Sequence, residues 1–160
     1  MGTEARRDRE HEHEVVKLSQ GATYLIEECR MVLPGVQAIF GFQLIAVFNE
    51  RFAHDLPKPV QWLHFGSLTL VALAAALVMT PAALHRITGV QHVTRAFLER
   101  SSTLLLASMW FLAVGLACDY FVVGWLIFES ALPAVAAALL LAVLSILWYF
   151  YPLAQKRRGM

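Results

Sequence analysis

Charged residues are scarce in this sequence, and several long stretches have none. Only 16% of the 160 residues are charged and 58% are hydrophobic, whereas a soluble domain has about 25% charged residues. Residues 101–117 and 131–151 carry no charge, and 60–84 have only Gln61 and His64 as strongly polar side chains, both near the start. A bilayer core requires about 20 apolar residues in a helix. These absences exclude an ordinary soluble domain and predict three membrane-spanning helices.

A fourth span, the shortest and most polar, precedes these three. The predicted fold is all-α: a bundle of four transmembrane helices preceded by an amphipathic cytoplasmic helix. We expect a single membrane domain at 31–151, with spans at about 31–48, 60–84, 101–123 and 127–151. This arrangement leaves no room for a separate soluble catalytic domain.

The segment before the first span divides into two parts. Residues 1–14 are almost wholly charged and are expected to be a disordered head. Apolar residues then recur at steps of three and four, which predicts an amphipathic interfacial helix at 15–30. Residues 152–160 form a basic cytoplasmic tail. No small-residue cleavage site follows the first apolar run, so we expect the first span to remain in the mature protein.

Basic residues are distributed unequally between the two sides of the predicted bundle. With both termini on one side, 11 lysines and arginines lie there and 2 lie opposite. Short loops rich in lysine and arginine stay in the cytoplasm. The sequence therefore predicts cytoplasmic termini and one fixed orientation, which argues against an antiparallel dimer.

Cysteine and metal-ligand patterns are also sparse. The two cysteines, Cys29 and Cys118, lie at opposite ends of their spans, too far apart for a disulfide within one chain. His11 and His13 alternate with glutamates in the head, but residues two apart point to different sides of a helix. We therefore predict no metal site.

Patterns typical of enzymes are missing as well. The sequence has no serine-histidine-aspartate set, no glycine-rich phosphate loop and no metal-spaced cysteines. Haem binding needs histidines on facing helices, but His64 and His85 flank the same span. We expect no catalysis, no cofactor and no nucleic-acid partner.

The first span carries polar and small residues where lipid would favour apolar ones. Steps of three and four place six of them in one line, the polar stripe: Glu27, Arg30, Pro34, Gln37, Ala38 and Gly41. Small residues admit a neighbouring backbone, and an amide in hydrocarbon needs a hydrogen-bond partner. We expect the stripe to face protein or a wet cavity, whereas Val71 in the second span should face lipid. Gln43 lies about 120° away around the helix, on a second face.

Two further groups of residues are candidates for function. His85 and Arg86 end the second span and are either a cytoplasmic anchor or a pH-responsive contact. Glu50, Asp119 and Glu129 are placed near the outer surface, either as ordinary solvated helix ends or as an acidic mouth that concentrates cations. Asp119 lies about 27 Å along the helix from Ser101. The centre of every predicted span therefore lacks an ionisable residue, and the sequence contains no internal repeat.

Two stretches, "ECRMVLPGVQAIFGFQLIAVFNERF" and "MTPAALHRI", give the sequence a family resemblance. It resembles a family of small four-span bacterial membrane proteins of unknown function, often labelled sodium/proton antiporter by automatic transfer, over roughly residues 20–124. The resemblance implies this fold and the bacterial inner membrane. It implies no catalytic residues.

These observations lead to one functional expectation and one alternative. We expect a multi-pass inner-membrane protein that forms a parallel homo-oligomer and conducts or transports small ions, a cation or a proton. In this reading the polar stripe and Gln43 line a pathway. The alternative is a non-transporting scaffold or partner-binding protein, in which the stripe is only a packing surface.

Overall fold

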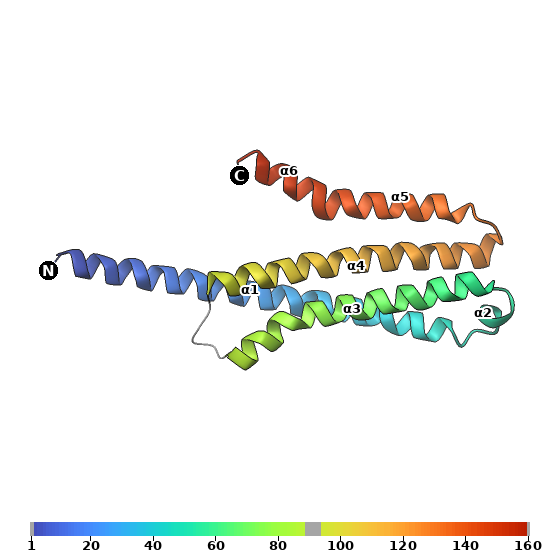
Figure 1. Cartoon of the computed structure of the whole chain (residues 1–160), viewed down its shortest axis with the longest axis horizontal. Coiled ribbons are helices and arrows are strands. Elements are labelled where there is room, and N and C mark those ends of the chain that lie inside the picture. The colour runs from blue at the N-terminus through green and yellow to red at the C-terminus, as the bar shows by residue number, and fades with distance from the viewer. Residues whose placement is uncertain (1, 89–93, 160) are drawn as a thin grey trace.

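The computed structural model describes residues 2–88 and 94–159, and every regular element in those ranges is a helix. The elements are α1 (Gly2–Ala46), α2 (Glu50–His54), α3 (Lys58–Thr88), α4 (Arg95–Phe128), α5 (Pro133–Ser145), the π-helical η1 (Ile146–Phe150) and α6 (Tyr151–Arg157). The long helices run alternately up and down, and both termini lie at the same end (Figure 1). The all-α prediction is confirmed.

Four helical segments in the described ranges are long and apolar enough to cross a membrane. They are Val16–Ala46, Lys58–Ile87, Arg95–Phe128 and Pro133–Arg157. The first three are longer than the apolar runs predicted for them, because a helix continues through polar residues where no proline or glycine ends it. The fourth has the predicted length of 25 residues but begins six residues later than predicted, because α4 continues to Phe128 and a turn follows it. The protein therefore crosses the membrane four times, as the sequence predicted.

Helix α1 is a single element of 45 residues. The parts that we expected as a disordered head, an interfacial helix and the first span are consecutive portions of it. Glutamate and arginine, which are frequent in the first 14 residues, are good helix formers. The side chains at 11–14 lie outside those that the structure describes. Pro34 lies within α1, and the helix continues through it.

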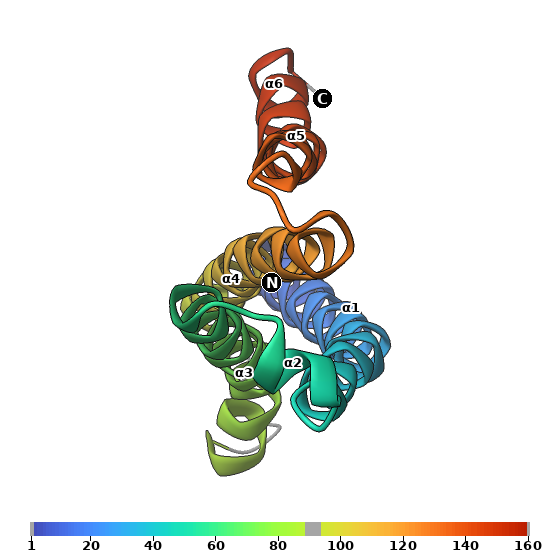
Figure 2. The ribbon, with the colours of Figure 1, turned by 90° about the vertical axis from the view of Figure 1, so that its right-hand side faces the viewer.

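Helices α1, α3 and α4 form a three-helix body (Figure 2). Its interior contains small and β-branched residues, among them Val71 and Ala74, which are both fully buried. Val71 packs against Gly115 of α4, so closely that a Cβ on the glycine would lie 2.9 Å from Val71 Cγ2. The expectation that Val71 faces lipid was therefore wrong. Around Val71, both the lipid-facing and the protein-facing sides of α3 carry apolar residues, so composition does not identify the side on which Val71 lies.

Helix α5 lies beside α4 and stands apart from α1 and α3 (Figure 2). The chain turns at Glu129, which adopts a left-handed conformation (φ 50°) as its backbone N–H donates to the Trp125 carbonyl. Gly124 then allows α5 to approach, because a Cβ there would meet the Pro133 ring and lie only 2.8 Å from its Cγ. Most of the fourth span is exposed in the single chain, as expected for a lipid-facing helix.

The fourth span contains a π-helical turn before α6. Pro152 lacks a backbone N–H, so the helix cannot keep its regular hydrogen bonds there. In the widened turn, the Tyr149 hydroxyl donates to the Leu106 carbonyl of α4, and its ring lies 5.9 Å from Trp110 in an edge-on contact. This contact ties the end of the fourth span back to α4.

Candidate functional site

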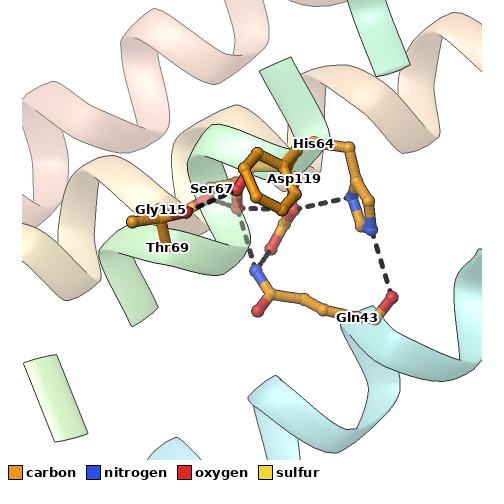
Figure 3. Close-up of polar contacts among 7 residues, drawn as sticks. Gln43, His64, Ser67, Thr69, Gly115 and Asp119 are labelled. Atoms are coloured by element: carbon orange, nitrogen blue, oxygen red, sulfur yellow. Dashed lines mark hydrogen bonds and ion pairs between the residues drawn. The ribbon is translucent and has the colours of Figure 1, made fainter. Parts of the chain in front are cut away.

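Four polar side chains meet inside the three-helix body, one or two from each helix (Figure 3). Gln43 comes from α1, His64 and Ser67 from α3, and Asp119 from α4. His64 and Ser67 are three residues apart and share a helical face. We call these four residues the Asp119 cluster.

The carboxylate of Asp119 receives hydrogen bonds from two neighbouring helices. Ser67 Oγ lies 2.6 Å from Asp119 Oδ1, and Gln43 Nε2 donates to Oδ2. Gln43 Nε2 also lies 2.8 Å from Ser67 Oγ. Ser67 has an alternative acceptor, the Gly115 carbonyl at 3.0 Å. The single Ser67 proton can therefore be directed to the carboxylate or to the backbone of α4.

The imidazole of His64 is oriented by a backbone group. Its Nε2 lies 3.1 Å from the Gln43 carbonyl oxygen, and because a carbonyl only accepts, Nε2 must carry a hydrogen. Its Nδ1 lies 3.3 Å from Asp119 Oδ1, within ion-pair distance, but without the alignment of a hydrogen bond. A neutral ring and an ionised carboxylate would direct two acceptors at each other. One additional proton, on either group, turns this repulsion into attraction.

The cluster is shielded from solvent. The side chain of His64 is 6% exposed and that of Asp119 is 19% exposed. Phe52 packs edge-on against the imidazole with ring centroids 5.1 Å apart, and it belongs to a buried apolar group with Leu56 and Val122. In such surroundings, electrostatic interactions are stronger than in water.

A cavity of about 430 Å³ adjoins the cluster between α1 and α4. Gln43, His64 and Asp119 line it, together with Asn49 in the turn after α1. The Gln43 Oε1 atom is buried and has no hydrogen-bond partner among the described residues. Among the residues that line the cavity, Asp119 therefore supplies a carboxylate and Gln43 an unused acceptor.

Of the three residues predicted as an outer acidic mouth, two are exposed and Asp119 is partly buried. Glu50 and Glu129 are exposed, at the start of α2 and just after α4. Asp119 lies nine residues before the end of α4, about 14 Å along the helix, and its side chain is directed into the bundle. It is joined there by Gln43, which the sequence had assigned to the first span.

The polar stripe lies on the outside of the single chain. Glu27, Arg30, Pro34 and Gln37 are exposed, and Gly41 is half-buried, although a Cβ placed on it would meet no neighbouring atom within 4 Å. The Gln37 amide has no hydrogen-bond partner among the described residues. The face of α1 that packs against the body carries Cys29, Val36 and Gln43 instead. The structure thus separates Gln43 from the stripe.

The two residues at the end of α3 lie beside the stripe. His85 is half-buried with its ring 6.1 Å from that of Phe97, and Arg86 is exposed. Both line a groove of about 650 Å³ between α1 and α3, which Arg30 also lines. Three basic side chains therefore gather at the end of the bundle that holds the termini.

The pairing of His64 with Asp119 was missed by sequence reasoning. Each residue was treated as a helix end because it lies beyond the apolar centre of its span. A signal was present, since His64 and Ser67 share one face of a span otherwise apolar. Such a face requires a polar partner from another helix.

Comparisons with known proteins identify the family but no characterised relative. No curated protein matches the chain, and no solved structure matches it. In the described residues, no group of three or more histidine, cysteine, aspartate or glutamate side chains is placed to hold a metal ion. A family model described as a family of unknown function, DUF6328, matches residues 11–152. The chain therefore belongs to this family of unknown function.

Proposed function

We propose that this protein transports protons across the bacterial inner membrane, with the Asp119 cluster as its proton-binding site. The observation that carries the proposal is the contact between His64 Nδ1 and Asp119 Oδ1 at 3.3 Å. With Nε2 committed to the Gln43 carbonyl, this contact is favourable only when one proton is held between the two side chains. The proposal assigns the protein no catalytic activity.

Ser67 provides a means of adapting to both protonation states. When the carboxylate is ionised, the Ser67 hydroxyl donates to it at 2.6 Å. When Oδ1 carries the proton, the hydroxyl can turn to the Gly115 carbonyl at 3.0 Å. Neither state leaves the serine proton without an acceptor, which lowers the cost of exchanging the site proton inside the membrane.

Access to the site differs between the two ends of the bundle. The cavity beside Asp119 extends to Asn49 in the turn that follows α1. Toward the other end, the interface of α3 is filled by fully buried apolar residues, including Ala74 and Val78. A transport cycle therefore requires these helices to separate after the site has been loaded. The bias of 11 to 2 basic residues supports cytoplasmic termini, so the loaded conformation faces the outer side.

Proton uptake into proteoliposomes containing a pH-sensitive dye would test this function. We expect the wild-type protein to exceed empty vesicles and Asp119→Asn to lose the excess, since asparagine cannot carry the exchanged proton. Glu129→Gln is the matched control, because Glu129 is an exposed acid on the same side. Wild-type flux equal to that of empty vesicles, in folded protein, would refute transport. Unchanged flux in Asp119→Asn would exclude the Asp119 cluster as the proton-binding site.

A second candidate function, that of a membrane scaffold, is favoured by the exposed polar stripe on α1. An unpaired amide such as Gln37 is unfavourable against lipid, and Gly41, one turn further along the same face, leaves open space beside it. We propose that a second parallel copy covers this face. Gln37→Leu should weaken association measurably, by up to about 1 kcal/mol, and energy transfer between labelled copies in bilayers would measure this change. Oligomers with unchanged affinity would exclude this face as the interface.

The two candidate functions predict different effects of the substitution Gln37→Leu. If copies associate only to build a scaffold, Gln37→Leu changes assembly and no flux exists to be lost. If each chain carries protons through its own Asp119 cluster, Gln37→Leu leaves the flux per chain unchanged, because Gln37 is not part of the cluster. A complete loss of flux in correctly assembled Gln37→Leu protein would contradict a pathway confined to Asp119.

A further inference from the structure

The cavity beside Asp119 has mainly apolar walls and a single acidic group. Its apolar lining includes six side chains from α1, α2 and α4: Ile39, Phe42, Ala46, Phe52, Val122 and Val123. No lysine or arginine occurs among the described residues that line it. Its volume of about 430 Å³ lies within the range of pockets that bind small organic molecules. The cavity is therefore much larger than proton binding alone requires.

The second polar feature of the cavity is an acceptor without a donor. Gln43 is only 5% exposed, and its Nε2 is used by Asp119 and Ser67. Its Oε1 has no partner among the described residues and projects away from the other members of the cluster (Figure 3). Buried polar atoms are normally hydrogen-bonded, so this acceptor indicates a ligand that donates an N–H or O–H group.

The position of the cavity restricts the ligand further. It lies between two membrane-spanning helices, so an amphipathic molecule can reach it from the bilayer. Phe42 and Phe52 provide aromatic surface on which a cation is also stabilised. A positive charge would satisfy the carboxylate, an N–H would satisfy Gln43 Oε1, and an apolar body would fill the remaining space.

We propose that this cavity binds a lipophilic ammonium, an aromatic or alkyl primary or secondary amine in its protonated form. The inference rests on the same site as the proposed proton transport and names a second substrate for it. The ammonium occupies the place beside Asp119, and the proton shared with His64 leaves to water. One positive charge enters and one leaves, so the net charge of the site is conserved.

Few groups other than His64 can contribute to this exchange. Helix α1 presents the neutral Gln43, and α3 presents His64 and the hydroxyl of Ser67. Cys118 precedes Asp119 on α4 but lines a different crevice, against α5. Binding of the amine should therefore weaken as the solution becomes more acidic, because protons and the ammonium compete for the same carboxylate.

Three probes with the same ring and different charges test the inference. They are 2-naphthylmethylamine, the neutral 2-naphthylmethanol and the anionic 2-naphthylacetate, followed by naphthalene fluorescence with purified protein in micelles and corrected with empty micelles. We expect saturable binding of the amine, release of protons into weakly buffered solution, and a loss of affinity of at least about tenfold in Asp119→Asn. Glu129→Gln should bind the amine as wild type does.

Other outcomes would overturn the inference. Equal binding of the alcohol and the amine, unaffected by Asp119→Asn, would mean that the cavity is a plain apolar crevice filled by lipid chains. Amine binding without proton release would mean that the site proton is not exchanged. The proposed transport is judged separately: amine binding without proton flux contradicts transport alone, and flux without amine binding contradicts the ligand alone.

Discussion

The contact between Val71 and Gly115 allows a sharp test of how closely α3 and α4 approach. In Gly115→Ala, the new methyl group would lie 2.9 Å from Val71 Cγ2. Overpacking of this kind costs about 1 to 3 kcal/mol, whereas replacing glycine by alanine within a helix contributes about 1 kcal/mol of stability. The net change expected for Gly115→Ala is a destabilisation of up to about 2 kcal/mol.

The sign should reverse when Val71 is shortened. In Val71→Ala the clashing Cγ2 atom is gone, and the next neighbours of the new methyl group are the Ser67 carbonyl oxygen at 3.5 Å and Leu70 Cβ at 3.7 Å. Both are ordinary contacts. Adding Gly115→Ala to Val71→Ala should therefore stabilise the protein by up to about 1 kcal/mol. The coupling energy between the two positions is then about 1 to 3 kcal/mol.

Unfolding in mixed micelles by added dodecyl sulfate, followed by the fluorescence of the four tryptophans, would measure each free energy. Gly66→Ala is the matched control on α3, because no neighbouring atom lies within 4 Å of a Cβ placed there; it should be neutral or slightly stabilising. Additive effects of Gly115→Ala and Val71→Ala would refute the close approach. So would a destabilisation by Gly66→Ala as large as that by Gly115→Ala.

Three further predictions concern the turn to the fourth span, the site and the topology. Gly124→Ala should be more destabilising than Gly115→Ala in the same unfolding assay, because its methyl group would meet two atoms of the rigid Pro133 ring, with Cγ at 2.8 Å. An equal or smaller effect would mean that α5 does not pack against α4 at Gly124. Ser67→Ala should lower proton flux and reduce stability by about 1 kcal/mol. Ser108→Ala is the control, because it removes a buried hydroxyl that is hydrogen-bonded within its own helix at 2.6 Å, and it should leave flux unchanged. Equal flux losses in the two variants would contradict the role of Ser67. Cysteines introduced in the tail should be labelled only from the cytoplasm, and those at the exposed positions Asp55 and Pro57 only from outside. Mixed labelling would contradict a single orientation.

Much of the fold could be predicted from the scarcity of charge alone. A run of about 20 residues without charge has few alternatives to a membrane helix, so the number and order of the spans follow from the sequence. The limits of each helix do not, because polar residues can continue a helix into water at little cost. This is why α1 begins at Gly2 rather than near residue 15 or 31.

The faces of the helices were harder to predict than their existence. In water, the apolar side of a helix identifies its packed face, but in lipid both sides are apolar. Val71 was therefore placed on the wrong side of α3, and Gln43 was grouped with the polar stripe of α1 although it lies on the face that packs against α3 and α4. The meeting of His64 with Asp119 depends on the relative rotation of two helices 55 residues apart in the chain, which no local pattern specifies.

The packing of α5 mainly against α4 also has a consequence for biosynthesis. All four members of the Asp119 cluster belong to the first three spans, so the cluster is complete before α5 leaves the ribosome. A charged residue within an inserting helix costs up to about 3 kcal/mol, the value for a residue at the centre. When α4 enters the membrane, Gln43, His64 and Ser67 are already available to receive its carboxylate. The order of the spans along the chain thus ensures that the acidic helix is inserted only after its partners.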